Sequence, residues 1–270
     1  MKYKIGTVAK LLGVAPETLR MYERHGILPM KREHGKNSYR YYGRLDITAL
    51  LRARAYHEYG FTMGQTRELL NTGDVMIALD GYRERERELA EEIRRKQHML
   101  AYLGSISALV EGLPQSLWQI RRAVRPGIYR LEFMHGDELV VPTEKYALFQ
   151  SWASLAPFAF TSQRNRWDAL LDGVDDSFSA LGVMEDDAAA LGMPPQLAEG
   201  TYYKPCPCLY TIVELSGEHV SCTDYLAHLA AYVRENGVKV TGDCICRTFL
   251  SLNKKDDYRR YREVWLPCEA

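Results

Sequence analysis

The chain has 270 residues, with 35 basic and 35 acidic side chains and a hydrophobic content of 46%. This length has room for two domains that each bury a core. It contains no run of 18 apolar residues and no signal-peptide pattern, so we expect a cytoplasmic protein without a membrane partner. All six cysteines lie between positions 206 and 268, and in a reducing compartment disulfides are not expected.

Charge is distributed unevenly along the chain. Residues 1–74 hold 13 Lys and Arg against 7 Asp and Glu, residues 75–115 hold 6 against 7, and residues 116–270 hold 16 against 21. Of the 29 aromatic residues, 19 lie in the acidic C-terminal part, including all four tryptophans. A basic N-terminal segment suits a polyanionic partner, which the acidic segment does not. We therefore expect three parts with different roles.

Residues 1–74, called the head, begin with two short predicted helices. An apolar stripe runs from Ile5 to Leu12 and ends at Gly13, and Pro16 suits the first turn of a second helix that Gly26 ends. Two helices joined by a tight turn form a helix-turn-helix, whose second helix presents its first residues to the DNA major groove. The polar side chains available for bases or phosphates are Lys10, Glu17, Thr18 and Arg20.

The sequence MKREHGKNSYRYYGR at 30–44 is basic, rich in turn residues and then rich in tyrosine. This pattern predicts a β-hairpin wing whose tyrosine hydroxyls and Arg40 contact phosphates. A further pair of helices is predicted over 46–59 and 62–70. The alternative is a small helical domain whose basic residues form an ordinary surface.

The sequence from Val75 to Glu111 contains no proline and predicts one helix of 37 residues, roughly 55 Å long. Mostly apolar residues recur at the a and d spacing of a coiled coil, in two series that Glu86, Lys96 and Ser107 interrupt: Tyr82, Leu89, Lys96, Leu103, Val110 and Leu79, Glu86, Ile93, Leu100, Ser107. We expect a coiled-coil dimerisation segment at 75–115. A long helix packed on its own domain is the alternative.

Residues 3–70 resemble the DNA-binding head of MerR-family transcription regulators, in IGTVAKLLGVAPETLRMYERHGIL and NSYRYYGRLDITALLRARAYHEYGFTMGQTRELL. The resemblance implies a winged helix-turn-helix in which Arg20, Tyr22, Tyr39, Arg40 and Tyr42 touch double-stranded promoter DNA. It also implies a homodimer joined by antiparallel helices. Such regulators distort a promoter whose spacer is too long, so that the RNA polymerase holoenzyme engages both promoter elements.

After Leu113-Pro114 the hydrophobic period changes from 3.6 to 2, which predicts an α+β domain over 116–270. Strands are predicted over 120–124, 128–134, 158–162, 208–215, 238–252 and 258–267, with helices over 143–155 and 222–236. Residues 168–199 are predicted to be mostly loop. The order of strands, helix and strands occurs twice, about 85 residues apart, which indicates a pseudo-symmetric domain with a cleft between its halves.

The strand YRRYREVWLP at 258–267 provides the best candidate for a ligand site. Tyr261, Glu263 and Trp265 share one face of this strand, while Arg262, Val264 and Leu266 share the other. A carboxylate between aromatic rings suits a lipophilic cation, because the rings add cation–π attraction of about 0.5–2 kcal/mol each. The alternative is an exposed edge strand on which Glu263 pairs with Arg260 or Arg247.

Residues 119–270 resemble a GyrI-like effector-binding domain of multidrug-sensing MerR regulators, in GTYYKPCPCLYTIVELSGEHVSCTDYLAHLAAYVRENGVKV and YREVWLP. The resemblance implies an aromatic pocket with Glu263 as its acid. The other candidates for the pocket wall are Tyr261, Trp265, Trp152, Phe158, Phe160 and Tyr210. Together these features predict a multidomain α+β activator that senses a lipophilic, cationic small molecule and uses no cofactor.

Two alternatives rest on other residues. Cys206 and Cys208 form one CxC pair and Cys244 and Cys246 another, and two such pairs on strands could bind zinc or copper in a thiol- or metal-responsive regulator. Buried cysteines that act as small hydrophobes are the more ordinary interpretation, so no metal site is predicted. An enzyme is also not expected, because no nucleophile–base pair stands out around Glu263.

Overall fold

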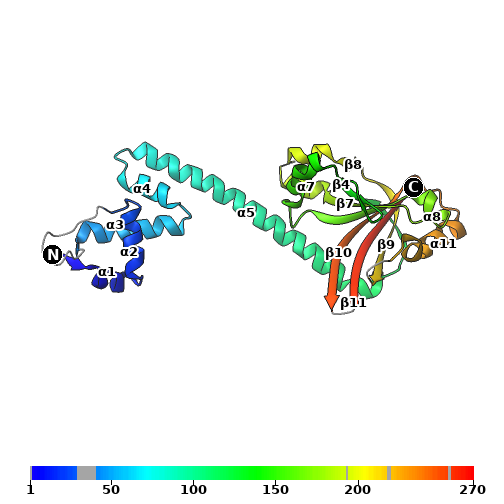
Figure 1. Ribbon diagram of the computed structural model, residues 1–270, viewed down its shortest axis with the longest axis horizontal. Helices are drawn as coiled ribbons and strands as arrows, with labels where there is room; N and C mark the ends of the chain where they lie inside the picture. Colours follow the sequence, from blue (N-terminus) through cyan, green and yellow to red (C-terminus); the bar gives the residue numbers. More distant parts are fainter. Residues whose placement is uncertain (1, 29–40, 193, 218–219, 255–256) are drawn as a thin grey trace. The chain divides into compact units, whose positions relative to one another are not determined.

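The computed structural model describes residues 2–28, 41–192, 194–217, 220–254 and 257–270 (Figure 1). The chain forms two compact units, Met1–Arg94 and Arg95–Ala270, whose boundary falls inside one long helix. In the described ranges, every helix is too short or too polar to cross a membrane.

The first unit opens with the predicted pair of short helices. Strand β1 (Tyr3–Lys4) leads into α1 (Ile5–Leu12), and Gly13 then adopts a left-handed conformation with φ of 66°. A left-handed residue after a helix is strongly favoured as glycine, because other residues pay a steric cost there. Helix α2 (Pro16–Arg24) starts after Ala15, whose methyl side chain cannot cap the helix. The turn and both helices therefore follow the prediction.

The rest of the first unit closes a small core over these helices. Strand β2 (Tyr41–Tyr42) pairs antiparallel with β1, and α3 (Arg44–Glu58) and α4 (Met63–Asn71) follow. Thr62 caps α4 by a capping box with Gln65. The core contains Val8, Leu19, Tyr22, Leu50 and Ala53. The predicted wing at 30–44 lies outside the described residues over most of its length.

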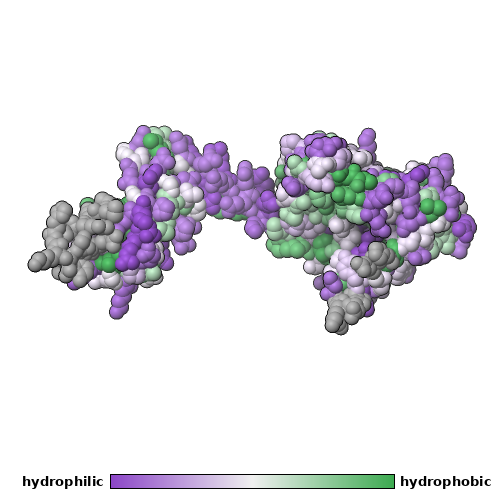
Figure 2. Space-filling model, viewed as in Figure 1, coloured by the Kyte–Doolittle hydropathy of each residue, from purple (hydrophilic) through white to green (hydrophobic). Residues whose placement is uncertain are grey.

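Helix α5 covers Val75–Glu111, the 37 residues that the sequence predicts. Four seam residues are strongly exposed for apolar side chains: Leu89 at 44%, Ile93 at 49%, Leu100 at 72% and Leu103 at 55%. Tyr82 differs from these, because its ring packs edge-on against Tyr56 and Phe61 of the first unit. The first position of one of the two seam series is therefore occupied by contacts within the chain. Figure 2 shows that the middle of α5 is mostly hydrophilic on the face in view.

The second unit is built on one antiparallel sheet with the strand order β3-β9-β11-β10-β6-β7-β4-β5, and β8 pairs with β4 outside this path. Two similar triplets, β9-β11-β10 and β4-β7-β6, meet where β10 pairs with β6. This order matches the predicted repeat. The strands are β3 (Arg121–Arg125), β4 (Ile128–His135), β5 (Glu138–Leu139), β6 (Phe160–Asn165), β7 (Ser177–Met184), β8 (Thr201–Tyr203), β9 (Cys206–Ser216), β10 (Cys244–Lys254) and β11 (Asp257–Pro267).

Helices cover the sheet. One face of β9-β11-β10 packs through Leu209, Val264 and Leu266 against α8, α10 and α11. The opposite face carries Tyr210 and Trp265. Residues at the end of α5 and directly after it pack against this face. The helical segments are α6 (Leu113–Ser116), η1 (Thr143–Lys145), α7 (Tyr146–Ala153), α8 (Trp167–Leu171), α9 (Glu185–Ala190), η2 (Pro195–Glu199), α10 (Cys222–Tyr225) and α11 (Ala227–Asn236).

The prediction of a mostly irregular segment at 168–199 was wrong. This segment contains β7, which pairs with β6 on one side and β4 on the other, and also α9 and η2. The small residues Ala180 and Gly182 weaken the strand pattern, but they fit beneath neighbours: a Cβ on Gly182 would lie 2.5 Å from Phe160. The strand predicted at 238–252 begins later, at Cys244.

Candidate functional site

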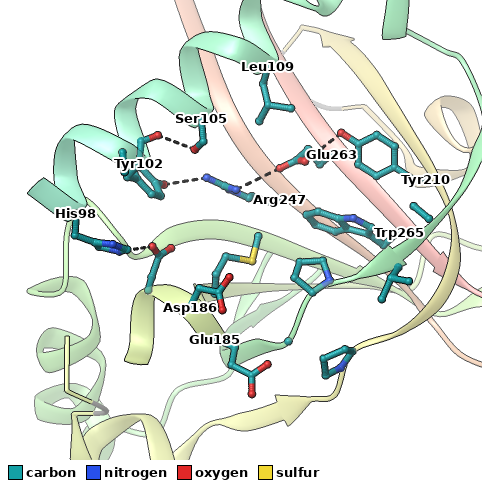
Figure 3. Close-up of a pocket in the computed structure, with 18 of the residues that line it drawn as sticks. His98, Tyr102, Ser105, Leu109, Glu185, Asp186, Tyr210, Arg247, Glu263 and Trp265 are labelled. Carbon is teal, nitrogen blue, oxygen red and sulfur yellow. Dashed lines mark hydrogen bonds and ion pairs between the residues drawn. The ribbon is translucent and has the colours of Figure 1, made fainter. Parts of the chain in front are cut away.

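The second unit contains a cavity of about 890 Å³ between the last part of α5 and the sheet (Figure 3). His98, Tyr102, Ser105 and Leu109 of α5 line it at intervals of four, three and four residues. This spacing places the four side chains on one face of the helix. The long helix therefore provides one wall of the cavity.

The opposite wall brings together three of the residues predicted for a ligand site. Glu263 and Trp265 alternate on β11, and Tyr210 lies directly opposite Trp265 on β9. The Tyr210 hydroxyl donates to Glu263 Oε1 at 3.1 Å. Trp265 and Tyr210 have ring centroids 6.1 Å apart. Carboxylate and rings thus face the same space, as Figure 3 shows.

Glu263 is 7% exposed and lies opposite Arg247 in the β10–β11 register. Arg247 Nη1 is 3.4 Å from Glu263 Oε2. Burial raises the pKa of Glu263, while Arg247, Tyr210 and Arg121 lower it by less. The pairing with Arg247 corresponds to the alternative raised from the sequence, but the strand is central in the sheet and is not an exposed edge.

Arg247 joins the sheet to α5. Its Nη2 donates to the Tyr102 hydroxyl at 3.1 Å, and its guanidinium carbon lies 5.4 Å from the Tyr102 ring centroid and 5.0 Å from that of Phe160. A second contact between α5 and the wall is made by His98 Nε2, 2.7 Å from Asp187 Oδ1 on α9. Burial raises the pKa of Asp187, against the opposing effect of His98.

The other residues predicted for the pocket wall lie apart from the cavity lining. Trp152 is fully buried in a separate core and donates its indole N–H to the Gln196 carbonyl. Phe158 is also fully buried and supports the lining from behind, with its ring 4.9 Å from His98 and 5.5 Å from Tyr102. Phe160 packs beneath Arg247, and Tyr261 lies farther along β11 beside Phe249.

Sequence reasoning missed the contribution of α5 and of Arg121, and it named Arg247 only as a partner of Glu263 on an exposed edge strand. Arg121 lies over the Tyr210 ring, 4.5 Å from its centroid, and also lines the cavity. A signal for α5 was available, because His98, Tyr102, Ser105 and Leu109 form a second stripe beside the predicted seam. The strand alternation identified Glu263 but could not identify the residue opposite it.

The two CxC pairs lie on opposite faces of the sheet. Cys208 belongs to the core that contains Tyr210 and Trp265, whereas Cys244 and Cys246 belong to the core beneath α10 and α11. Burial is the main cause that raises the pKa of Cys208 to about 11. Within the described ranges, no group of three or more His, Cys, Asp or Glu side chains is placed to hold a metal ion. The geometry therefore separates the two predicted thiol pairs.

In the head, Lys10, Glu17 and Arg20 are exposed and Thr18 is half-buried. Glu17 accepts from Arg20 Nη1 at 2.9 Å and from Arg24 Nη1 at 2.8 Å, and these arginines lower its pKa. A carboxylate held by two arginines is less available to accept from a base than the sequence suggested.

Two other predicted DNA contacts are buried in the head. Tyr22 is 7% exposed and belongs to the core, and Tyr42 is 3% exposed and donates to Glu23 Oε1 at 2.9 Å. Both rings hold α2 and β2 on the core, and their contact with DNA stays a prediction. Tyr39 and Arg40 lie outside the described residues.

Comparison with known proteins identifies this helix-turn-helix unit as that of a regulatory protein. Residues 3–72 match the model of the MerR HTH family regulatory proteins. A mercuric resistance operon regulatory protein of Serratia marcescens is 31% identical over 102 residues, which cover 38% of this chain and 69% of that protein. The chain belongs to the MerR family.

Other matches cover different shares of the two chains. The mercuric resistance operon regulatory protein of Bacillus cereus is 36% identical over 74 residues, or 27% of this chain, and the chain spans only about half of that relative (55%). The match to a chain in the cryo-electron microscopy structure of an EcmrR–DNA complex in EcmrR-RPo covers 99% of this chain and 99% of that chain, at 16% sequence identity and a TM-score of 0.38.

Proposed function

We propose that this protein is a ligand-responsive transcription activator that binds promoter DNA as a homodimer and senses a lipophilic cation in its C-terminal domain. The observation that carries the proposal is the cavity in which the buried Glu263, Trp265 and Tyr210 face α5. The helix that walls this cavity continues into the helix-turn-helix unit. A ligand in the cavity would therefore touch the element that leads to the DNA-binding head.

DNA binding is supported by the family membership and by the charge of the head. The exposed side chains of Lys10 and Arg20 lie on the two helices of the helix-turn-helix. Cationic side chains there would release counterions from DNA on binding, which makes affinity salt-dependent. Arg20→Ala is expected to weaken binding to promoter duplexes selected from a random pool, and Arg122→Ala, in the other unit, is not. Equal affinities in fluorescence anisotropy would remove Arg20 from the interface.

Dimerisation is supported by the exposed apolar seam of α5. Leu100 and Leu103 are 72% and 55% exposed in the single chain, and a second helix would remove this apolar surface from water. Leu100→Glu is expected to convert dimers to monomers in analytical ultracentrifugation. Gln97→Glu adds the same charge at an exposed polar position and is expected to leave the dimer intact. A dimeric Leu100→Glu variant would contradict the seam.

In the proposed mechanism, the dimer holds two heads on one palindromic promoter and bends a spacer that is too long for the RNA polymerase holoenzyme. Deforming a site of this size costs on the order of 1–6 kcal/mol. The ligand supplies a bias between two protein–DNA states only if it contacts them differently. In vitro transcription with and without ligand tests this step, and ligand-independent transcription would favour a constitutive DNA-binding protein.

The cavity suits an aromatic or aliphatic cation because it combines a buried carboxylate with two aromatic rings. Burial of an ionised carboxylate is costly without a compensating charge, so an incoming cation gains from Glu263. Arg247 and Arg121 also reach this wall, while Glu185, Asp186 and Asp187 line the cavity from the α9 side. Acidic residues therefore outnumber the arginines around the cavity.

The test is a titration of the full chain with tetraphenylphosphonium, followed by tryptophan fluorescence, since Trp265 lines the cavity. Glu263→Gln is expected to weaken binding about tenfold or more, which corresponds to the loss of one charged contact. The matched control is Glu132→Gln, a half-buried carboxylate outside the cavity lining. Equal affinities for both variants would exclude Glu263 as a ligand contact.

A parallel titration with Zn²⁺ tests the thiol- or metal-responsive alternative, which the separation of the two CxC pairs on opposite sheet faces disfavours. Recovery of the intact cation after incubation tests for an enzyme. Zinc binding without a response to the cation would favour a thiol- or metal-responsive regulator that uses the cysteines.

A further inference from the structure

Arg247 occupies the position in the cavity where carboxylate and ring contacts converge. It lies opposite Glu263 across the β10–β11 pair, and its guanidinium lies within 5.4 Å of the ring centroids of Tyr102 and Phe160. A guanidinium is flat, delocalised and weakly hydrated, and it stacks on aromatic rings. These are also the properties of a lipophilic organic cation. The chain thus supplies from its own sequence a group with the chemistry of the proposed ligand.

The contacts of Arg247 are poor for a buried charge. The residue is 7% exposed, yet its Nε is buried without a hydrogen-bond partner among the residues that the structure describes. The distance of 3.4 Å to Glu263 Oε2 is longer than the 2.7–2.9 Å that is typical of a strong charge-assisted hydrogen bond. Burial of an ion pair is favourable only with good geometry and satisfied donors. Little stabilisation is therefore lost when another cation takes the carboxylate.

We propose that Arg247 is an internal counter-ion that a cationic ligand displaces from Glu263, and that this displacement releases Tyr102 of α5. The inference rests on the proposed sensing function and specifies its coupling step. Arg247 makes both contacts through different nitrogens, Nη1 to Glu263 and Nη2 to Tyr102. Movement of the guanidinium away from the carboxylate therefore changes the contact with the helix as well.

The release of Tyr102 gives a ligand the differential contact that a switch requires. Two polar contacts join α5 to the wall, from Arg247 to Tyr102 and from His98, one turn earlier, to Asp187. Displacement removes the first attachment and leaves the second. A ligand shifts an equilibrium only by the difference between its interactions with the two states. A neutral aromatic compound would occupy the cavity without competing for Glu263, so its binding would leave Tyr102 attached.

Arg247→Met in the full chain tests the displacement. Removal of the competing guanidinium is expected to tighten tetraphenylphosphonium binding about tenfold, the equivalent of one charged hydrogen bond. The matched control is Arg122→Met, which removes one positive charge from an exposed arginine whose side chain donates to the Glu269 carbonyl. Equal affinities of the wild type and Arg247→Met would overturn the displacement and leave cation sensing intact. Absence of saturable binding in all three proteins would overturn the sensing function as well.

Hydrogen exchange on the wild-type protein tests the release without depending on a variant. Saturating tetraphenylphosphonium is expected to speed amide exchange in α5 around Tyr102. Tyr102→Phe keeps the ring and removes the hydroxyl that Arg247 contacts, so we expect faster exchange there before any cation is added and a smaller response to it. A cation that binds but leaves or slows exchange in this part of α5 would overturn the release of Tyr102.

Discussion

Two carboxylate–arginine clusters lie in the two halves of the C-terminal sheet, and they differ in how well the carboxylate is compensated. Glu132 on β4 accepts from Arg164 at 2.8 Å and 3.3 Å and from Arg130 at 3.1 Å. Glu263 on β11 forms an ion pair with one arginine of the described ranges, Arg247, whose Nη1 lies 3.4 Å from Glu263 Oε2. The repeated architecture therefore carries one well-satisfied cluster and one poorly satisfied cluster.

The pKa values of the two carboxyls shift in opposite directions. Burial disfavours ionisation of both, but the hydrogen bonds and charges of Arg164 and Arg130 outweigh it for Glu132, so its pKa is lowered. For Glu263, burial dominates and the pKa is raised. A carboxylate satisfied by the protein is structural, whereas one that lacks strong compensation beside a cavity has interactions left for a ligand.

The largest expected effect is on stability. Arg164 also donates to Asp243 at 2.8 Å, so Arg164→Met leaves two acidic groups short of a partner. We expect it to lower the free energy of unfolding by about 3 kcal/mol, and Arg247→Met by about 1 kcal/mol or less, because Glu263 is already poorly compensated. Urea titrations followed by tryptophan fluorescence report on this domain, which holds all four tryptophans. An equal loss in both variants would break the distinction.

Neutralisation of the two carboxylates should affect stability differently. At neutral pH, Glu132→Gln removes a favourable charge and is expected to cost on the order of 1–2 kcal/mol. Glu263→Gln removes a charge that the fold disfavours and is expected to leave stability unchanged or raise it by up to about 1 kcal/mol. The same urea titrations measure both. A clear loss in Glu263→Gln would show that the Arg247 pair is stabilising.

The pH dependence of cation binding follows from the raised pKa of Glu263. A carboxyl group whose pKa is higher in the folded than in the unfolded protein stabilises the fold at pH values below its unfolded pKa, near 4.5. This contribution is lost as the pH rises through the pKa of the folded protein. Cation binding has the opposite dependence, because it requires the ionised carboxylate. Affinity is therefore expected to fall as pH falls through the folded pKa, starting above 4.5. Isothermal titration calorimetry should show a weaker dependence on pH in Glu263→Gln, where the carboxyl of Asp187, whose pKa burial also raises, remains.

The smallest expected effect concerns Tyr210. Its hydroxyl donates to Glu263, and Tyr210→Phe removes this bond while it keeps the ring. We expect a further rise in the pKa of Glu263 and a loss of cation affinity of a few-fold, about 0.5–1.5 kcal/mol. A shift of the binding profile toward higher pH separates this cause from a change in packing. An unchanged profile would show that the hydroxyl does not assist the carboxylate.

The sequence determined the features that depend on neighbours along the chain. The period of apolar residues located α5 at Val75–Glu111, and Gly13 and Pro16 marked the turn between α1 and α2. Strand alternation placed Glu263 and Trp265 on one face of β11. These predictions succeeded because helix and strand periods are set by local backbone geometry.

Tertiary structure decided the features that depend on distant residues. Strand β7 forms because β6 and β4 pair with it on both sides, although its own composition indicates a loop. The β10–β11 register places Arg247 opposite Glu263, whereas Arg260 lies on β11 itself. Trp152 and Phe158 became core because helices cover them, while Tyr102 reached the cavity because the last part of α5 packs on its own domain, the alternative to a helix used for dimerisation alone. Local patterns fix which face a side chain occupies, but packing between elements fixes what that face meets.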